Sequence, residues 1–222
     1  MKRKLLVTIL MSALLLSNET LYAKDILKEQ LEDASAGSIA SRFIGGFYWG
    51  AGFQGTVGSE VTTSIDNSEY STNFLGFLVE GGVYGLFNPI RNFADIEVGL
   101  NAKYNTGLNS DSGKKKFHPA LFQSTIYSGF VFRFDKGKKA LSIGVSKALY
   151  MREYVDDEMK TVGLKEHDIE NGLGLYVEYQ RPDLKVGKGI AFTRFEVEKF
   201  DVITNNEKDS ETIASFLVGF KY

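Results

Sequence analysis

The chain contains no cysteine, so it can form no disulfide, hold no metal through thiolates and carry no lipid on an N-terminal cysteine. Proline occurs only three times and tryptophan once, and the two histidines leave few candidates for acid–base catalysis. The mean hydropathy of −0.14 gives no indication of a helical membrane protein. A basic surplus is also missing, because the formal net charge is −2, so the composition gives no reason to expect a nucleic-acid partner.

An apolar run at the N-terminus, residues 5–16, is too short to span a membrane as a helix. Cations at positions 2–4 precede it and a site ending at Ala23 follows it, which predicts a secretory signal peptide over residues 1–23. Leu21 is larger than the residue such a cleavage site prefers, and a retained N-terminal anchor is the alternative. Removing the signal leaves 23 Lys and Arg against 27 Asp and Glu, a net charge of −4.

Glycine, with 23 residues, and aromatic residues, at 13%, are plentiful, and this combination favours strands. Residues 24–41 form a polar, weakly amphipathic piece that we interpret as a periplasmic lead-in, although it could also enter the barrel described below. From residue 42 to residue 222, apolar and polar residues alternate with a period of two, most clearly in 93–104. The alternating segments are 46–57, 73–87, 93–104, 121–134, 140–152, 172–180, 189–201 and 212–222.

The connections between these segments alternate between short and long, which is typical of an up-and-down meander across a membrane. The sequence therefore predicts an all-β protein, an eight-stranded antiparallel up-and-down transmembrane β-barrel over residues 42–222. The prolines agree with it, because Pro89, Pro119 and Pro182 all fall in expected connections or at a strand start. The long loops, expected on the outer side, are 58–72, 105–119, 153–170 and 202–211.

One face of the alternating segments is apolar, and the other carries small residues, tyrosines and charges of both signs. The interior of an eight-stranded barrel is just wide enough for side chains to fill it, so we expect these charges to pair inside the barrel while the apolar rows contact lipid. A lipocalin-like soluble barrel with an apolar core is the alternative. The predicted lumen charge network consists of Glu80, Asp95, Glu97, Lys103, Arg133, Glu178, Arg194, Glu196 and Glu198. The predicted interior tyrosines are Tyr48, Tyr84, Tyr127, Tyr150 and Tyr176.

Two places fit this pattern poorly. Lys147 falls in a lipid-facing row, so we expect it near the outer headgroups or displaced by a β-bulge. Ile190 and Phe192 fall in the opposite row to Phe195, which suggests a bulge in the seventh strand as well.

The last segment ends in alternating apolar residues and a terminal aromatic residue, and it resembles the closing strand of bacterial outer-membrane proteins. Together with the signal peptide and the meander, it is similar to the small OmpA/OmpX-type barrels of Gram-negative bacteria. The resemblance implies a location in the bacterial outer membrane, contact with its lipid and lipopolysaccharide, and recognition by the outer-membrane insertion machinery. The residues implied to form this insertion signal are Phe216, Val218, Phe220 and Tyr222.

Candidate chemistry is sparse. His118 lacks the serine two residues on that lipid-hydrolysing barrels of the outer membrane use, and the acidic stretch 156–170 around His167 lacks the spacing of a calcium loop. We therefore expect no catalytic residue, no metal and no cofactor. Lys114, Lys115 and Lys116 could contact phosphates or a host surface, although a charged loop apex also explains them.

The sequence thus favours a non-enzymatic barrel protein with a structural or surface-interaction role carried by its extracellular loops. A narrow channel for small solutes or ions is the alternative, and a lipid-modifying enzyme is a third hypothesis. The sequence does not identify a ligand or a host partner.

Overall fold

The computed structural model describes residues 43–58, 62–71, 73–90, 94–110, 113–187, 189–204 and 207–222. The signal peptide and the lead-in predicted for residues 1–41 lie outside these described residues. Among the described residues, no helix is long and apolar enough to cross a membrane.

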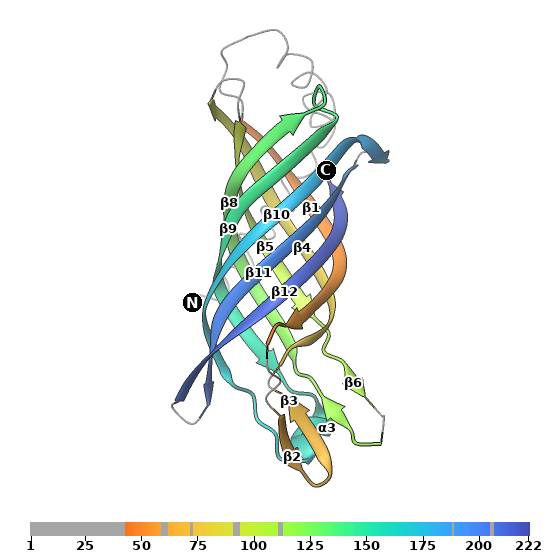
Figure 1. Ribbon diagram of the computed structural model, residues 1–222, viewed down its shortest axis with the longest axis vertical. Helices are drawn as coiled ribbons and strands as arrows, with labels where there is room; N and C mark the ends of the chain where they lie inside the picture. The colour runs from red at the N-terminus through yellow and green to blue at the C-terminus, as the bar shows by residue number, and fades with distance from the viewer. Residues whose placement is uncertain are drawn as a thin grey trace, which may run out of the picture.

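Eight antiparallel strands form a closed barrel in the order β1-β12-β11-β10-β9-β8-β5-β4 (Figure 1). The barrel closes because β1 pairs with β12 on one side and with β4 on the other. Each strand otherwise pairs with its neighbours along the chain, so the up-and-down order predicted from the sequence is confirmed. The strands are β1 (Phe43–Thr56), β4 (Leu75–Ile90), β5 (Ala94–Asn105), β8 (Ala120–Phe134), β9 (Lys139–Tyr154), β10 (Asp168–Val186), β11 (Gly189–Thr204) and β12 (Glu207–Lys221).

Several strands are longer than the sequence predicts. β10 has 19 residues, whereas the apolar alternation covers only 172–180. The expected loop 202–211 is mostly an extension of the β11–β12 hairpin, and β11 and β12 pair as far as Thr204 and Glu207. The reason is that backbone pairing continues after the strands leave the apolar zone, where side chains no longer need to alternate.

The two faces of the wall differ as the sequence predicts. Apolar side chains point outward and are exposed, with Leu175 at 67% and Phe53 at 58%. Charged side chains point inward, and Glu80, Glu178 and Arg194 are all at most 2% exposed. A soluble barrel would bury its apolar rows in its interior, so the lipocalin-like alternative is wrong. The outer surface is the one that a barrel inside a bilayer requires.

The prolines within strands coincide with irregular pairing. Pro89 lies in β4 where its register with β5 shifts, and Pro182 lies in β10 where its register with β11 shifts. These two residues were expected in connections, so that expectation is wrong in detail. A bulge tolerates proline as a connection does, because a residue there need not donate an N–H to the hydrogen-bond ladder of the sheet.

Two other expectations need correction. In β9 the register shifts beyond Lys147, so Tyr150 points outward and Met151 packs inside, the reverse of the prediction. Ile190 and Phe192 are both buried, and β11 pairs with β12 without a shift, so the bulge expected in the seventh strand is absent there. The lumen accepts apolar side chains at its ends, which the strict apolar-out pattern does not anticipate.

Glycines make room for the large rings in the lumen. A Cβ added at Gly99 would lie 2.4 Å from Cζ of Tyr127, a buried ring.

We therefore expect Gly99→Ala to lower the free energy of unfolding by about 1–3 kcal/mol, the usual effect of overpacking. Gly81→Ala is the matched control, because its added Cβ would lie 3.7 Å from the nearest atom. Urea titration in lipid vesicles measures both variants, and an equal loss in the two would contradict the packing argument.

At the end of the barrel opposite the short turns, three connections fold together into a small lobe (Figure 1). We call this the loop-side lobe. It has its own core, made by Tyr70, Phe117, Val155, Met159 and Leu164. Its elements are β2 (Thr62–Ile65), β3 (Ser68–Ser71), β6 (Asn109–Ser110), β7 (Lys116–Phe117) and α3 (Asp157–Thr161).

Candidate functional site

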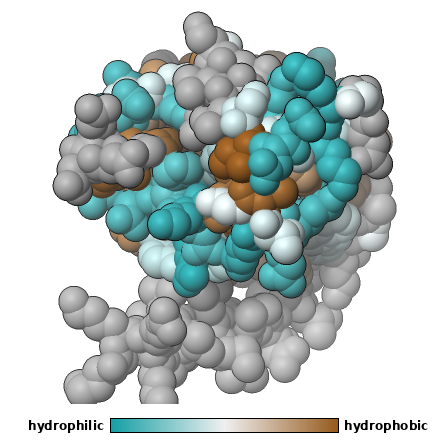
Figure 2. Space-filling model, turned by 90° about the horizontal axis from the view of Figure 1, so that it is seen from below, coloured by the Kyte–Doolittle hydropathy of each residue, from teal (hydrophilic) through white to brown (hydrophobic). Residues whose placement is uncertain are grey.

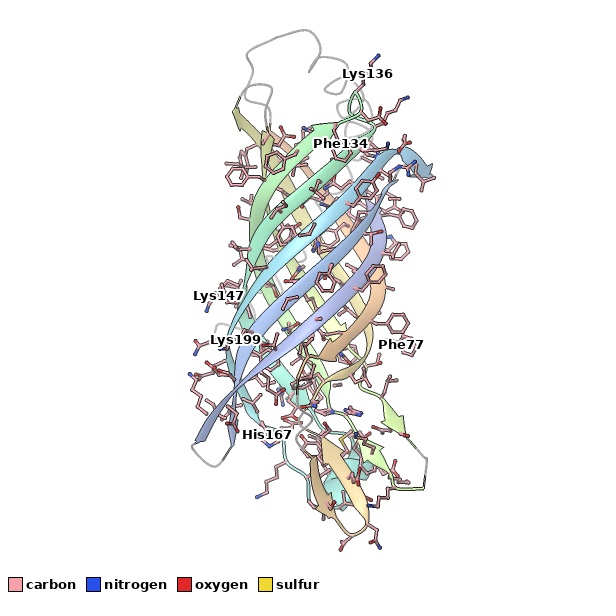
Figure 3. The ribbon with its side chains drawn as sticks, viewed as in Figure 1. Phe77, Phe134, Lys136, Lys147, His167 and Lys199 are labelled. Carbon is pink, nitrogen blue, oxygen red and sulfur yellow. The ribbon has the colours of Figure 1, made fainter. Side chains whose placement is uncertain are left out.

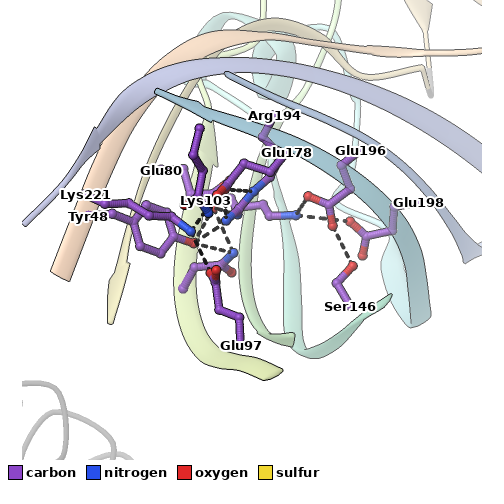
Figure 4. A network of polar contacts seen from close by, with 12 residues as sticks. Tyr48, Glu80, Glu97, Lys103, Ser146, Glu178, Arg194, Glu196, Glu198 and Lys221 are labelled. Carbon is purple, nitrogen blue, oxygen red and sulfur yellow. Dashed lines mark hydrogen bonds and ion pairs between the residues drawn. The ribbon is translucent and has the colours of Figure 1, made fainter. Parts of the chain in front are cut away.

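The centre of the lumen is organised around Arg194 on β11 (Figure 4). Its Nη1 donates to Oε1 of Glu80 at 2.7 Å and its Nε donates to Oε2 of Glu178 at 2.9 Å. The guanidinium also lies about 5 Å from the ring centroids of Tyr48, Tyr127 and Tyr176. The charge is therefore balanced by two carboxylates and surrounded by aromatic faces, a favourable setting for a buried arginine.

A second group of charges surrounds Lys103 on β5. Its Nζ lies 2.6 Å from Oε2 of Glu196 and 3.8 Å from Oε2 of Glu198. Ser146 donates to the other oxygen of Glu196 at 2.5 Å, and Gln123 donates to Glu198 at 3.1 Å. All five side chains are nearly inaccessible, so this group links four strands across the interior.

Lys221 on β12 completes the network, although it is not among the predicted lumen charges. Its Nζ lies 2.7 Å from Glu97 and 2.6 Å from Glu178, and it is 3% exposed. The signal was available, because Lys221 has the same parity as Ser215 and Gly219 on the lumen face of the last segment. Closeness to the C-terminus obscured it, since a penultimate lysine ordinarily suggests a solvated chain end.

The structure brings seven of the nine predicted charges into this central network. Arg194 pairs with Glu80 and Glu178, Lys103 lies beside Glu196 and Glu198, and Glu97 pairs with Lys221. Asp95 and Arg133 pair with each other nearer the short turns. Uncharged groups also belong to the interior, notably Tyr48, one of the predicted interior tyrosines, whose hydroxyl donates to Glu80 at 2.6 Å. Toward the lobe, the lumen is filled by Phe74, Leu121, Ile169, Phe200, Val202 and Ile213.

The loop-side lobe holds the lysines that the sequence suggested for surface contact. Lys114 lies 3.4 Å from Glu69, and Lys115 forms an ion pair with Glu158 in α3. Lys116 lies in β7, which pairs with β3 and β6. These lysines thus help to join the lobe, and their contact with an outside partner stays a prediction.

The acidic stretch 156–170 contributes a helix cap and not a metal site in the described residues. Asp156 caps α3, its side chain accepting from the backbone N–H of Met159 at 2.8 Å. His118 is buried, with Nδ1 3.1 Å from the backbone oxygen of Asn73, so it is part of the lobe's base.

A buried carboxylate that the sequence did not indicate, Glu153, ties the lobe to the barrel. Tyr70 donates to its Oε1 at 2.5 Å, and Nδ1 of His167 lies 2.9 Å from its Oε2. The hydrogen bond to Glu153 raises the pKa of His167 above its ordinary value, more than burial lowers it, and Glu211 and Asp168 act in the same direction. Burial raises the pKa of Tyr70, so its hydroxyl stays protonated and keeps donating.

This arrangement predicts a pH-dependent stability. Because the folded protein binds the His167 proton more tightly than the unfolded chain, the stabilisation is complete below the ordinary histidine pKa of about 6.5 and is lost as the pH rises through the raised value. The free energy of unfolding of the wild type should therefore exceed that of His167→Gln by about 1 kcal/mol at acidic pH, and the two values should converge at alkaline pH. Unfolding titrations across this range measure the difference, and a constant gap would contradict it. His118 is present in both proteins, so its contribution cancels.

A pocket of about 470 Å³ lies where the lobe meets the outer wall of the barrel. Outward-facing rings of Tyr104, Phe122 and Tyr154 line it from β5, β8 and β9, and Asn109 and Asp156 line it from the lobe. Its size and its mixture of aromatic and polar groups are those of small-ligand sites in general. Viewed from this end, the molecular surface is mostly hydrophilic around a small hydrophobic patch (Figure 2).

No protein-family model and no curated protein sequence matches the chain. Among solved structures, the chain is similar to Neisserial surface protein A, at 12% identity over 79% of this chain and 95% of that one, with a TM-score of 0.39. The outer membrane protein OprG from Pseudomonas aeruginosa has 10% identity over 83% and 99%, with a TM-score of 0.34. The Yersinia pestis outer membrane protein Ail has 12% identity over 81% and 100%, with a TM-score of 0.31. The barrel fold itself is established by the strand pairing of this chain.

Proposed function

We propose that the chain is an integral protein of the bacterial outer membrane, and that its loop-side lobe contacts a ligand at the cell surface. The apolar outer wall supports the membrane location, and the closing strand β12 supports insertion by the outer-membrane machinery. Its Phe216 and Val218 point outward, and Tyr222 stacks on Phe47 with ring centroids 4.9 Å apart.

The observation that carries the interaction role is the folded lobe. Ion pairs, a four-stranded sheet and a separate core hold three connections in one arrangement, although a barrel needs only flexible links there. Loops fixed on a rigid scaffold are where binding usually resides. The pocket at the base of the lobe supplies a place for a ligand.

The orientation can be tested on intact cells, because the native chain has no cysteine. Lys114→Cys in the lobe should react with a membrane-impermeant maleimide on whole cells. Lys136→Cys, exposed in a short turn at the opposite end, should react only after lysis (Figure 3). The reverse pattern would overturn the orientation, and equal labelling of soluble extracts would overturn the membrane location.

The interaction role can be tested by replacing residues 62–71 with a short Gly-Ser linker. Cells displaying the wild type should adhere to at least one surface in a panel of glycans and matrix proteins, and the replacement should abolish that adhesion. A substitution in the turn 135–138 is the control at the other end, and a heat-modifiability gel confirms that each barrel folds. Adhesion that survives the replacement would contradict the proposal.

The interior argues against the channel hypothesis. Among the described side chains, ion pairs cross the lumen and an apolar cluster lies beside them, as expected for a barrel whose interior is filled by side chains. We expect purified protein in planar bilayers to show no steady conductance. Stable single-channel steps would instead support a channel.

A further inference from the structure

Two lysines interrupt the apolar outer wall. Lys147 on β9 and Lys199 on β11 both point outward and are exposed. Each pairs in register with Leu173 on β10, so the two lysines flank one leucine on the same face. Both lie on the outer wall near one another (Figure 3).

The lysines lie at the edge of the apolar zone toward the lobe. From Leu184, exposed near the short turns, to Leu173, β10 rises roughly 28 Å along the barrel axis at a typical strand tilt, close to the height of the apolar band of such barrels. A lysine is tolerated at this depth because its long stem lets the ammonium reach the headgroups.

Both ammonium groups are available. Within the described part of the chain, neither lies within 4.0 Å of a carboxylate. The nearest acidic residue toward the lobe on β11, Asp201, is already engaged by Lys208 at 2.9 Å, Asn171 at 3.0 Å and Ser210 at 2.9 Å. The lobe lysines differ, since Lys114 and Lys115 face carboxylates.

The spacing suits one anionic group. Two strand separations place the Cα atoms of Lys147 and Lys199 roughly 10 Å apart, so the two side chains can converge above Leu173. Leu173 between them offers an apolar contact to an acyl chain. A lipid that carries a phosphate offers both the anionic group and the acyl chain.

We propose that Lys147, Leu173 and Lys199 form a binding site for a phosphate group of lipopolysaccharide in the outer leaflet. The choice of lipopolysaccharide rests on the proposed outer-membrane location. The site differs from the lobe lysines, because it lies on the lipid-facing wall and holds its ligand from the side.

The test measures binding of purified, folded protein in detergent to lipopolysaccharide, to the same lipid after enzymatic dephosphorylation, and to phosphatidylglycerol. Lys147→Gln and Lys199→Gln should each weaken lipopolysaccharide binding about fivefold, and the double variant about 25-fold. Lys136→Gln, at the opposite end, is the matched control and should bind as the wild type does. Dephosphorylation should weaken wild-type binding and leave the double variant unchanged.

Three results would overturn the proposal: unchanged binding by the double variant, an equal loss in Lys136→Gln, or phosphatidylglycerol binding as tightly as lipopolysaccharide. The lipid comparison uses wild-type protein alone, so it stays decisive even where a variant folds poorly. The whole-cell labelling described above separately tests the location, so failure of one does not imply failure of the other.

Discussion

Arg194→Met should lower the free energy of unfolding by about 3–5 kcal/mol, because it leaves Glu80 and Glu178 buried without their shared cation. Lys221 still reaches Glu178, but no other described cation lies within 4.0 Å of Glu80. Unfolding by urea in lipid vesicles, followed by the mobility shift of the folded barrel, measures the change.

The matched control is Arg181→Met on β10. Arg181 also pairs with a carboxylate, Asp183, but both side chains are more than a third exposed, so the expected loss of stability is far smaller than for Arg194→Met. Adding Glu80→Gln to Arg194→Met should restore part of the stability, because it removes one stranded charge. Equal losses in the two arginine variants would show that burial of the network contributes nothing.

Val177→Arg should have a comparable effect, here through the outer wall instead of the lumen. Val177 is 44% exposed and lies on the outward row of β10 between Leu173 and Leu184, so in water an arginine there would be harmless. In a bilayer, an arginine near the midplane costs about 2–4 kcal/mol. The same unfolding measurement in vesicles gives the value.

Leu184→Arg is the control for depth. Leu184 lies on the same strand and is 52% exposed, but it is close to the short turn, where an arginine reaches the headgroups at a cost of about 0–1 kcal/mol. If both variants were as stable as the wild type, the outer wall would not be in contact with hydrocarbon.

The alternating pattern predicted the two faces of the barrel wall because a side chain on a strand can point in only two directions. The parity of Glu178, Arg194 and Glu196 predicted a position in the lumen, and all three side chains are buried in the structure. The prediction of inward and outward faces failed where a bulge inserts one residue into a strand. The bulge beyond Lys147 exchanges the faces of Tyr150 and Met151. The lysine in the apolar row suggested a bulge, but not which residues would change face.

The sequence did not predict the loop-side lobe, for a different reason. Its sheet joins β3 to β7 across the chain, and its core combines Tyr70 with Phe117 and Met159. Short segments without a regular period carry no signal of which distant segment they meet. Glu153 was missed likewise, since it looked like one more charge beside an acidic loop.

The sequence by itself determined the eight-stranded wall, its inward and outward faces and most of the lumen charges, because alternation with a period of two is a local property of a strand. Only the tertiary structure decided which charges pair, how Lys221 joins them, where Lys147 and Lys199 meet beside Leu173, and how the loops form a lobe. Those features depend on the register between strands and on contacts between distant segments, and a single strand's pattern contains neither.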